Sequence, residues 1–549
     1  MHLFVVFIIA LFLTIALVPV CRSLALKMNI VDVPDARKIH TAPMPRSGGI
    51  SMALGAFVPI LLWVPSGSFF NSVLAGSAII VVSGLIDDIR PLNAVQKIIP
   101  QTISALIVIF WGGVQIRYPG LIFSHDHAVS LCVSVPLTLF VILGVTNAVN
   151  LADGLDGLAG GISMLTFVLT AFLAYRCANM AVAVMAVAMA GAVTGFLRYN
   201  THPSTLFMGD AGSQLLGFLS IILAIAITQT NTPYSRILSL PLIGFPILDT
   251  ITVMAERIIR KKSPFSADKR HFHHKLLALG FLHSEAVVII YMIQACFIAM
   301  ALVLRFYPCW VPLFCFVLMS AMIFILFSAA GKKQWKLERK KGFGRLMRRY
   351  SGLLKDNNIV IRLSFAGLCY GLPLMMAAQI MIPDRIPGAF SVVSACLFVS
   401  GVFVWHCCKA EKSREMMLRA GVYFITPVII YLGQARPSPW MNEMMNTADN
   451  MGFIFLVLAV VVTMNMTRRK KGFRVTTLDV LVIIVVAVFP NLPSLHPASF
   501  NAGITLAKSL VIFFSYDVLA GELRGNTGPV AKSCAMVLAF LMGRAAAGL

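Results

Sequence analysis

The stretch VSLCVSVPLTLFVILGVTNAVNLADGLDGLAGGISMLTFVLTAFLA, residues 129–174, decides how this chain folds. It contains two apolar runs, Val129 to Val145 and Ile162 to Ala174, on either side of a short polar segment. Four polar side chains of that segment recur at every third residue: Asn147, Asn150, Asp153 and Asp156. This spacing keeps neighbours on one side of a helical or tightly turning backbone. The stretch therefore predicts two membrane segments with a polar face where they meet.

The polar segment also contains glycines at 154, 157, 160 and 161, which let the chain leave ideal helix and let a ligand approach the backbone closely. Two carboxylates at a membrane edge are costly unless a cation such as Mg²⁺ neutralises them. A solvated turn rich in Asn, Gly and Asp is the alternative interpretation. Taken alone, the segment favours neither interpretation over the other.

The composition of the whole chain indicates a polytopic helical membrane protein. Of 549 residues, 58% are hydrophobic and only 12% are charged, and the mean hydropathy is +0.86. The 45 Lys and Arg against 22 acidic residues would suggest nucleic acid in a soluble protein. Here the basic residues lie mostly in short loops, which favours positive-inside topology and anionic lipid, and no nucleic-acid partner. The eleven cysteines are scattered without a CxxC pair, as expected of buried small hydrophobic side chains.

Apolar runs outside the opening stretch predict a core of about eleven transmembrane helices. The candidate spans lie near residues 3–25, 48–65, 70–87, 95–112, 129–147, 158–175, 179–197, 213–230, 236–258, 284–305 and 309–330. The first run has no positive residue before it and no clear cleavage site, so we expect a retained helix rather than a signal peptide. Arg22 and Lys27 follow it, which places the N-terminus outside and the next loop inside.

Alternation from that start makes residues 26–47, 88–94, 148–157, 198–212, 259–283 and 331–357 the cytoplasmic loops. The basic residues concentrate in these loops, and the opposite loops carry only single arginines such as Arg117. All the unusual polar clusters of the first 283 residues also fall on this side. Such convergence predicts one active site at the cytoplasmic face.

The remaining chain predicts an accessory membrane domain. Residues 331–357 form a basic stretch with interspersed aromatic and aliphatic residues, as in a linker that lies on the inner leaflet. Residues 358–549 contain about six or seven further apolar runs, near 359–382, 389–408, 420–433, 451–466, 475–490, 503–520 and 530–545. No acid or histidine cluster comparable to those of residues 1–330 is evident there, and the sequence assigns this domain no chemistry.

Three acidic residues stand where predicted spans end or begin. Asp87 and Asp88 close the third span, where the helix macrodipole and their mutual repulsion both disfavour them. A metal, a cationic ligand or a shared proton would relieve both penalties. Asp210, in FMGDAGS, precedes the eighth span; it is either a helix N-cap or part of a diphosphate–metal site.

A further cluster follows the ninth span, in SPFSADKRHFHHKL. His271, His273 and His274 favour hydrogen bonding to phosphate over a zinc site, because no Cys or Glu lies beside them. Arg270 would add positive charge. Asp249, some nine residues inside the ninth span, is either a functional acid or a partner of a neighbouring helix.

Together, Asp87-Asp88, NAVNLADGLDGLAGG, FMGDAGS, PILDT and SPFSADKRHFHHKL resemble the polyprenyl-phosphate N-acetylhexosamine-1-phosphate transferases. The resemblance covers residues 1–330, with five motifs in order. The His-x-His-His form resembles the branch that uses UDP-GlcNAc, whereas the peptidoglycan branch has three successive histidines. The resemblance implies that a UDP-N-acetylhexosamine, with GlcNAc favoured, and undecaprenyl phosphate give undecaprenyl-diphospho-sugar and UMP. Mg²⁺, or Mn²⁺ as the alternative, would be the cofactor.

The resemblance also implies roles for individual residues. Asp210 would bind the metal with Asp88 and Asp153. Asp87 would deprotonate or orient the lipid phosphate, and Asp88 and Asp156 would complete the catalytic acids. Substrate would be bound by the following residues: Asn150, Asp153, Asp249, Arg270, His271, His273 and His274, with Arg37, Lys38, His40 and Arg46 receiving the anionic lipid head.

The implied setting is the bacterial inner membrane and the first membrane step of a cell-envelope polysaccharide, such as the O-antigen of lipopolysaccharide. The sequence leaves open whether the protein forms a homodimer. It also leaves open whether a glycosyltransferase or a flippase docks on the C-terminal extension. A secondary transporter with acids as ion sites is the alternative function, although transporter sites usually lie near the midplane. An enzyme acting on CDP-alcohols is disfavoured because the Asp-Gly-x-x-Ala-Arg signature is missing.

Overall fold

The computed structural model confirms an all-α polytopic membrane protein. It describes residues 2–32, 43–120, 128–229, 232–261, 271–332, 358–386, 411–466, 476–488, 502–523 and 528–547, with short pieces between 388 and 402. Two two-residue strands, β1 (Val31–Asp32) and β2 (Met44–Pro45), pair antiparallel with Val31 opposite Pro45. The chain divides into two compact units, one of residues 1–338 with 476–485 and one of residues 339–475 with 486–549.

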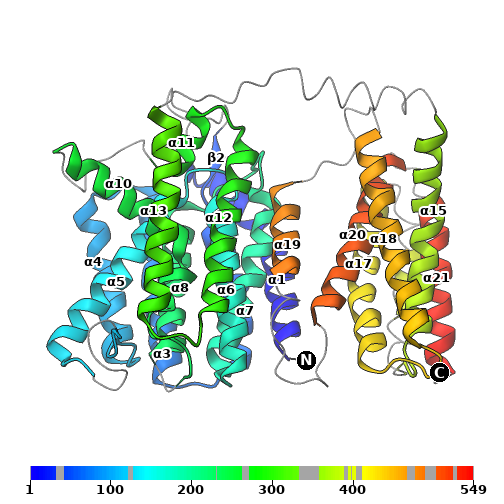
Figure 1. Ribbon diagram of the computed structural model, residues 1–549, viewed down its shortest axis with the longest axis horizontal. Coiled ribbons are helices and arrows are strands. Elements are labelled where there is room, and N and C mark those ends of the chain that lie inside the picture. The colour runs from blue at the N-terminus through cyan, green and yellow to red at the C-terminus, as the bar shows by residue number, and fades with distance from the viewer. Residues whose placement is uncertain are drawn as a thin grey trace. The chain divides into compact units, whose positions relative to one another are not determined.

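The first unit is a helical bundle (Figure 1). Its helices are α1 (His2–Lys27), α2 (Gly48–Trp63), α3 (Ser68–Ile89), α4 (Ala94–Phe110), α5 (Leu131–Ala152), α6 (Leu158–Arg176), α7 (Met180–Asn200), α8 (Gly209–Thr228), α9 (Ser239–Leu242), α10 (Gly244–Ile259), α11 (Phe272–Ala278), α12 (His283–Val303) and α13 (Trp310–Lys332), and the residues of α19 (Thr477–Val488) up to Val485 group with them. Eight of these helices are long and apolar enough to cross a membrane, and α2 and α4 are shorter apolar helices.

Helix α8 is the buried centre of the first unit, since its entire apolar window is buried. Two glycines let neighbouring helices meet its first turn. A Cβ on Gly49 of α2 would lie 2.3 Å from the backbone nitrogen of Gly212, and one on Gly84 of α3 would lie 2.4 Å from the Cα of Ala211. Small residues permit such close helix packing in membranes. The packing brings the end of α3 against the start of α8, which is where the predicted acids stand.

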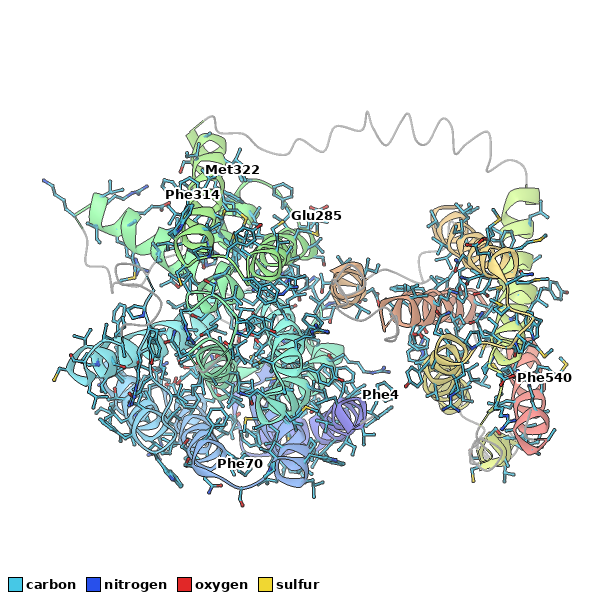
Figure 2. The ribbon with its side chains drawn as sticks, turned by 60° about the horizontal axis from the view of Figure 1, so that its bottom comes forward. Phe4, Phe70, Glu285, Phe314, Met322 and Phe540 are labelled. Carbon is cyan, nitrogen blue, oxygen red and sulfur yellow. The ribbon has the colours of Figure 1, made fainter. Side chains whose placement is uncertain are left out.

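The outer helices present apolar side chains outward. In Figure 2, Phe314 and Met322 lie at the outer edge of the first unit, and they are 61% and 54% exposed. Only 17% of the apolar window of α13 is buried. Exposed apolar side chains on helices of this length are those that a bilayer covers.

The predicted ninth span, 236–258, is wrong as a single helix, because the structure divides it into α9 and α10 at Ile243. Pro246 has no N–H with which to bond the carbonyl of Leu242. That carbonyl instead accepts hydrogen bonds from Thr166 Oγ1 at 2.8 Å and Gln294 Nε2 at 2.9 Å, and Gln294 Oε1 accepts from the N–H of Phe245 at 2.9 Å. Side chains of α6 and α12 therefore satisfy the backbone that the break exposes.

The second unit is built from α15 (Asn358–Met381), α17 (Glu411–Ala435), α18 (Glu443–Met466), α20 (Ala502–Leu523) and α21 (Gly528–Ala546). Their apolar side chains form one core that includes Leu372, Ile429, Leu456, Ile512 and Leu541. Most of the predicted run 389–408 and nearly all of the predicted linker 331–357 lie outside the described residues.

Three polar side chains on separate helices meet inside the second unit. Lys508 Nζ lies 2.5 Å from Asp449 Oδ2, and both side chains are buried. The other carboxylate oxygen of Asp449 accepts a hydrogen bond from Gln379 Nε2 at 2.6 Å. The sequence pattern had not indicated this ion pair, because its members are 59 residues apart.

Candidate active site

Asp87 and Asp88 end α3, and both are buried. Asp87 Oδ1 accepts a hydrogen bond from the N–H of Leu92 at 2.6 Å, which fixes this carboxylate against the turn into α4. Asp88 points the other way, toward α8. The adjacent carboxylates therefore bind different partners, which reduces the repulsion expected between them.

The Asp88 carboxylate lies at the N-terminus of α8. Its two oxygens accept hydrogen bonds from the N–H groups of Asp210 at 3.0 Å and Ala211 at 3.3 Å. Gly209 has a φ of +73°, and a Cβ there would lie 2.3 Å from Asp88 Oδ2, so glycine is required on both counts. The free N–H groups predicted at this helix start do face an anion, and in this structure it is Asp88. Asp210 itself stands inside the first turn of α8 rather than at the N-cap, which is Met208.

Lys97 of α4 joins two of the predicted site acids. Its Nζ lies 2.5 Å from Asp87 Oδ2 and 2.7 Å from Asp210 Oδ2. Sequence reasoning missed this residue, although a lysine inside an apolar helix is a signal that could have found it. The capping box of Asn93 and Gln96, which starts α4, sets where Lys97 falls on the helix.

Arg46 is the member of the predicted lipid-head group that the structure describes. It forms an ion pair with Asp32, and its Nη1 lies 3.9 Å from Asp88 Oδ1. The backbone around it is tied to the residues before α8, since Gly48 N–H donates to the Phe207 carbonyl at 3.0 Å. Arg37, Lys38, His40 and Arg270 lie outside the described residues.

The asparagines of the opening stretch belong to α5, which continues to Ala152, beyond its predicted end at residue 147. Asn150 Oδ1 accepts a hydrogen bond from Ser213 Oγ of α8 at 2.6 Å. Asn147 Nδ2 donates to Gln101 Oε1 of α4 at 2.8 Å. These bonds connect the last turns of α5 to the two helices that carry Asp210 and Lys97.

Asp153 follows the end of α5 and is half-buried. Its pKa is raised to about 7, first by burial and next by the carboxylates of Asp210, Asp88 and Asp156, against the opposing effect of Arg46. The contributions of Asp210 and Asp88 to this shift indicate that Asp153 lies within electrostatic reach of the acids of α3 and α8. We call Asp87, Asp88, Asp153 and Asp210 the acidic cluster.

The donor set of the acidic cluster fits a hard divalent cation. Carboxylate oxygens are the ligands that Mg²⁺ prefers, and the four acids bring negative charge that such a cation would neutralise. A lysine ammonium already bridges two of the four carboxylates, so the cluster attracts positive charge.

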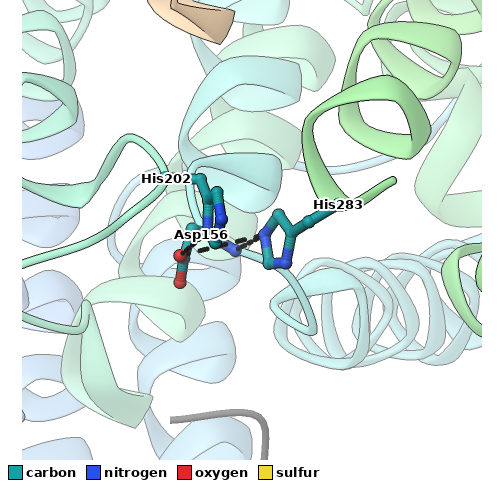
Figure 3. Close-up of side chains that lie close together, drawn as sticks. All are labelled: Asp156, His202 and His283. Carbon is teal, nitrogen blue, oxygen red and sulfur yellow. Dashed lines mark hydrogen bonds and ion pairs between the residues drawn. The ribbon is translucent and has the colours of Figure 1, made fainter. Parts of the chain in front are cut away.

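Asp156 is in contact with two histidines (Figure 3). Its Oδ2 is 2.7 Å from His202 Nδ1, and its Oδ1 accepts a hydrogen bond from Ser204 Oγ at 2.9 Å. The N–H of Asp156 donates to His283 Nε2 at 2.9 Å. Sequence reasoning did not single out His202, Ser204 or His283, which come from the segment after α7 and the start of α12. We call these four residues the Asp156 group.

The predicted histidine motif begins α11, and Asp249 of α10 fixes its position. Asp249 Oδ2 is 2.8 Å from His271 Nδ1, and Asp249 Oδ1 accepts from the N–H of Phe272 at 2.8 Å. Asp249 is thus bonded to a neighbouring element, the alternative that the sequence had left open; its role in substrate binding stays a prediction. His273 packs on Gly154, where a Cβ would lie 2.3 Å from its Nε2.

His273 is buried, and its pKa is lowered to about 3 by burial first and by His274, His271 and His283 next, against the opposing effect of Asp249. It is therefore neutral at physiological pH, and the contacts of its ring are packing contacts rather than ion pairs. Its ring stacks with that of His271 at 5.8 Å between centroids.

Comparison with known proteins identifies the family. Residues 70–228 match the model of glycosyl transferase family 4, a range that contains every acid of the acidic cluster. A Bacillus subtilis protein, "Probable undecaprenyl-phosphate N-acetylglucosaminyl 1-phosphate transferase", is 32% identical over 348 residues, which are 63% of this chain and 97% of that protein. The chain belongs to glycosyl transferase family 4.

Two further proteins are similar over comparable shares of the chain. A Yersinia pestis protein is 32% identical over 60% of this chain and 92% of its own length. An Escherichia coli K12 protein is 31% identical over 58% of this chain and 88% of its own length. Both are named "Undecaprenyl-phosphate alpha-N-acetylglucosaminyl 1-phosphate transferase". Each covered share is about the size of the first unit, which confirms the family resemblance.

Proposed function

We propose that this protein transfers N-acetylhexosamine-1-phosphate, with GlcNAc-1-phosphate as the favoured group, from a UDP-sugar to undecaprenyl phosphate at the cytoplasmic face of a bacterial inner membrane. The observation that carries the proposal is the acidic cluster, in which Lys97 bridges the carboxylates of Asp87 and Asp210, and Asp88 binds the N-terminus of α8. The names of the similar proteins support the lipid acceptor and the sugar.

In the reaction, an oxygen of the lipid phosphate attacks the phosphorus next to the sugar. A new phosphorus–oxygen bond forms, the bond from that phosphorus to the bridging oxygen breaks, and UMP leaves with the bridging oxygen. Bound Mg²⁺ would supply charge neutralisation on the diphosphate. Asp210, Asp88 and Asp153 are the residues we assign to hold it.

Other residues of this site would align the two substrates. Lys97 and Arg46 bring positive charge beside the acids, where the anionic phosphates must approach each other. We assign Asp87 to orient the lipid phosphate, because its carboxylate is held at the edge of the cluster by the Leu92 N–H. Asn150 and Asp153, at the end of α5, would position the nucleotide.

The test is to incubate the purified full-length protein with Mg²⁺, undecaprenyl phosphate and a panel of UDP-sugars. We expect UMP release in equal amount to a lipid diphospho-sugar, identified by mass, with the highest rate for UDP-GlcNAc. UMP release that does not depend on the lipid phosphate, or no release with any UDP-N-acetylhexosamine, would contradict the proposal. UMP release with UDP-GalNAc alone would support the proposed reaction but show that the transferred sugar is GalNAc rather than GlcNAc.

A further inference from the structure

The Asp156 group fixes both the carboxylate and the backbone of one loop residue. His202 Nδ1 and Ser204 Oγ bind the two carboxylate oxygens at 2.7 and 2.9 Å, and the Ser204 N–H adds a longer bond of 3.3 Å. His283 Nε2 binds the backbone N–H of the same residue at 2.9 Å. The side chain of Asp156 is thus held by His202, 46 residues away in sequence. Its backbone N–H is held by His283, 127 residues away.

The hydrogen-bond directions determine the protonation of both rings. A carboxylate only accepts, so Nδ1 of His202 carries a proton. A backbone N–H only donates, so Nε2 of His283 is unprotonated and that ring is neutral with its proton on Nδ1. The Nδ1 atom is buried and has no hydrogen-bond partner among the described residues. Leaving a buried N–H donor unpaired costs free energy, and the Nε2 atom of the same ring accepts the hydrogen bond from Asp156.

The next loop residue is held in the same way. Gly157 N–H donates to Asn200 Oδ1 at 2.9 Å, and the Gly157 carbonyl accepts from Tyr291 OH at 2.7 Å. Asn200 ends α7 and Tyr291 belongs to α12, the elements that provide or adjoin His202 and His283. The loop of residues 153–157 is therefore tied at its far end to α7 and α12, whereas Asp153 at its near end belongs to the acidic cluster.

We propose that His202 and His283 are positioning residues that act through Asp156 to set the loop of residues 153–157 against the acidic cluster. This inference rests on the proposed function. In Figure 3 the two rings lie side by side beside Asp156 and approach it from different elements; they stack at 4.2 Å between centroids with 16° between their planes. The stacking fixes each ring against the other, so the loss of His202 removes one contact to the carboxylate of Asp156 and the loss of His283 removes the contact to its amide.

A transition-metal site is the other arrangement that one Asp and two His could form, since their ligand atoms lie within 4.8 Å of one another. The Nε2 lone pair of His283, however, already accepts the Asp156 N–H, so a metal would have to break the bond that holds the loop. The observed contacts therefore favour positioning.

The experiment compares pairs of variants in the purified full-length protein. His202→Asn keeps a donor near the position of Nδ1, and His283→Gln keeps an acceptor near the position of Nε2, whereas His202→Ala and His283→Leu remove them. We expect the two removing variants to lower kcat about tenfold or more, as for a lost hydrogen bond that leaves its partner group unpaired, with the KM for undecaprenyl phosphate unchanged. The two conservative variants should stay within about threefold of the wild type.

Tyr234→Phe is the matched control, because it removes a buried hydrogen bond of 3.0 Å to the Leu173 carbonyl far from the loop. It should lower thermal stability without changing kcat. Wild-type kcat in both removing variants, or equal losses in the conservative variants, would overturn the proposal. One equivalent of Zn²⁺ bound by the wild type and lost in His202→Asn would also overturn it, in favour of a metal site.

Hydrogen exchange separates this inference from the proposed function. His283→Leu should raise the exchange rate of the amides in residues 153–157, which needs no substrate. If the wild type releases no UMP but exchange rises, the proposed function fails and the positioning contacts stand. If UMP is released but exchange and kcat are unchanged in the variant, the inference fails alone.

Discussion

Asp210 contacts one cation and one anion through different groups: its carboxylate binds the ammonium of Lys97, and its N–H donates to the carboxylate of Asp88. Asp210→Asn keeps the backbone and the shape of the side chain but removes the charge. We expect loss of Mg²⁺-dependent UMP release by at least about a hundredfold, with the protein still folded. The measurement is turnover against Mg²⁺ concentration.

Glu443→Gln is the control for that experiment, because Glu443 is an exposed acid at the start of α18. It should turn over at the wild-type rate. Normal Mg²⁺-dependent turnover in Asp210→Asn would remove this residue from the metal site.

Lys97 places an ammonium where a metal would also neutralise Asp87 and Asp210. Lys97→Met removes this competing charge, so we expect Mg²⁺ to bind about tenfold more tightly, measured as the Mg²⁺ concentration that gives half of the maximal thermal stabilisation. Lys97→Arg keeps the charge and should resemble the wild type. Weaker Mg²⁺ binding in Lys97→Met would mean that the lysine supports the metal instead of competing with it.

His273 links pH to stability, because its pKa is about 3 in the folded protein and 6.5 as the ordinary value. Between these values the unfolded chain binds a proton that the folded protein does not. Its contribution to stability is therefore complete above about pH 6.5 and is lost as the pH falls, by about 1 kcal/mol per pH unit. We expect His273→Gln to show a shallower loss of thermal stability between pH 7 and 5. Identical pH dependence in the two proteins would contradict the assignment.

At the scale of elements, the site depends on how one helix ends against the start of another. The helix macrodipole disfavours the two acids at the C-terminus of α3 and favours a negative charge at the N-terminus of α8. Close packing at Gly84 and the left-handed conformation of Gly209 bring these ends together, so the penalty on Asp88 is offset by the α8 backbone. The site therefore requires both the C-terminus of α3 and the N-terminus of α8.

The helices of the second unit are joined by a buried ion pair, Asp449 to Lys508. Asp449→Asn would leave the ammonium of Lys508 buried without its counter-charge, and we expect about 3–5 kcal/mol of destabilisation. Replacing both residues by apolar ones, as Asp449→Leu with Lys508→Met, should recover most of it. The measurement is thermal unfolding of the full-length protein, with UMP release as a control that should not change. Wild-type stability in Asp449→Asn would show that the pair does not stabilise the bundle.

At the scale of the whole molecule, the described residues of the acidic cluster and the Asp156 group all precede residue 284, and the similar proteins cover about 60% of the chain. We therefore expect truncation after about residue 338 to retain UMP release. Residues 476–485 group with the first unit, so the truncated protein should be less thermally stable than the full chain. A folded, monodisperse truncation without turnover would show that the extension is integral to catalysis.

The sequence by itself determined the membrane class, most of the helices and the acids of the acidic cluster. Those features depend on local patterns, namely apolar runs of spanning length and polar motifs at their ends. The division of the ninth span was within reach as well, since Pro246 lies inside it, but the break is stable only because Thr166 and Gln294 bind the freed carbonyl.

Only the tertiary structure decided which groups face each other across the chain. Lys97 lies 113 residues from Asp210, and His283 lies 127 residues from Asp156, so no spacing along the sequence relates them. The physical reason is that a buried polar group must find a partner, and the packing of separate helices determines which one it meets.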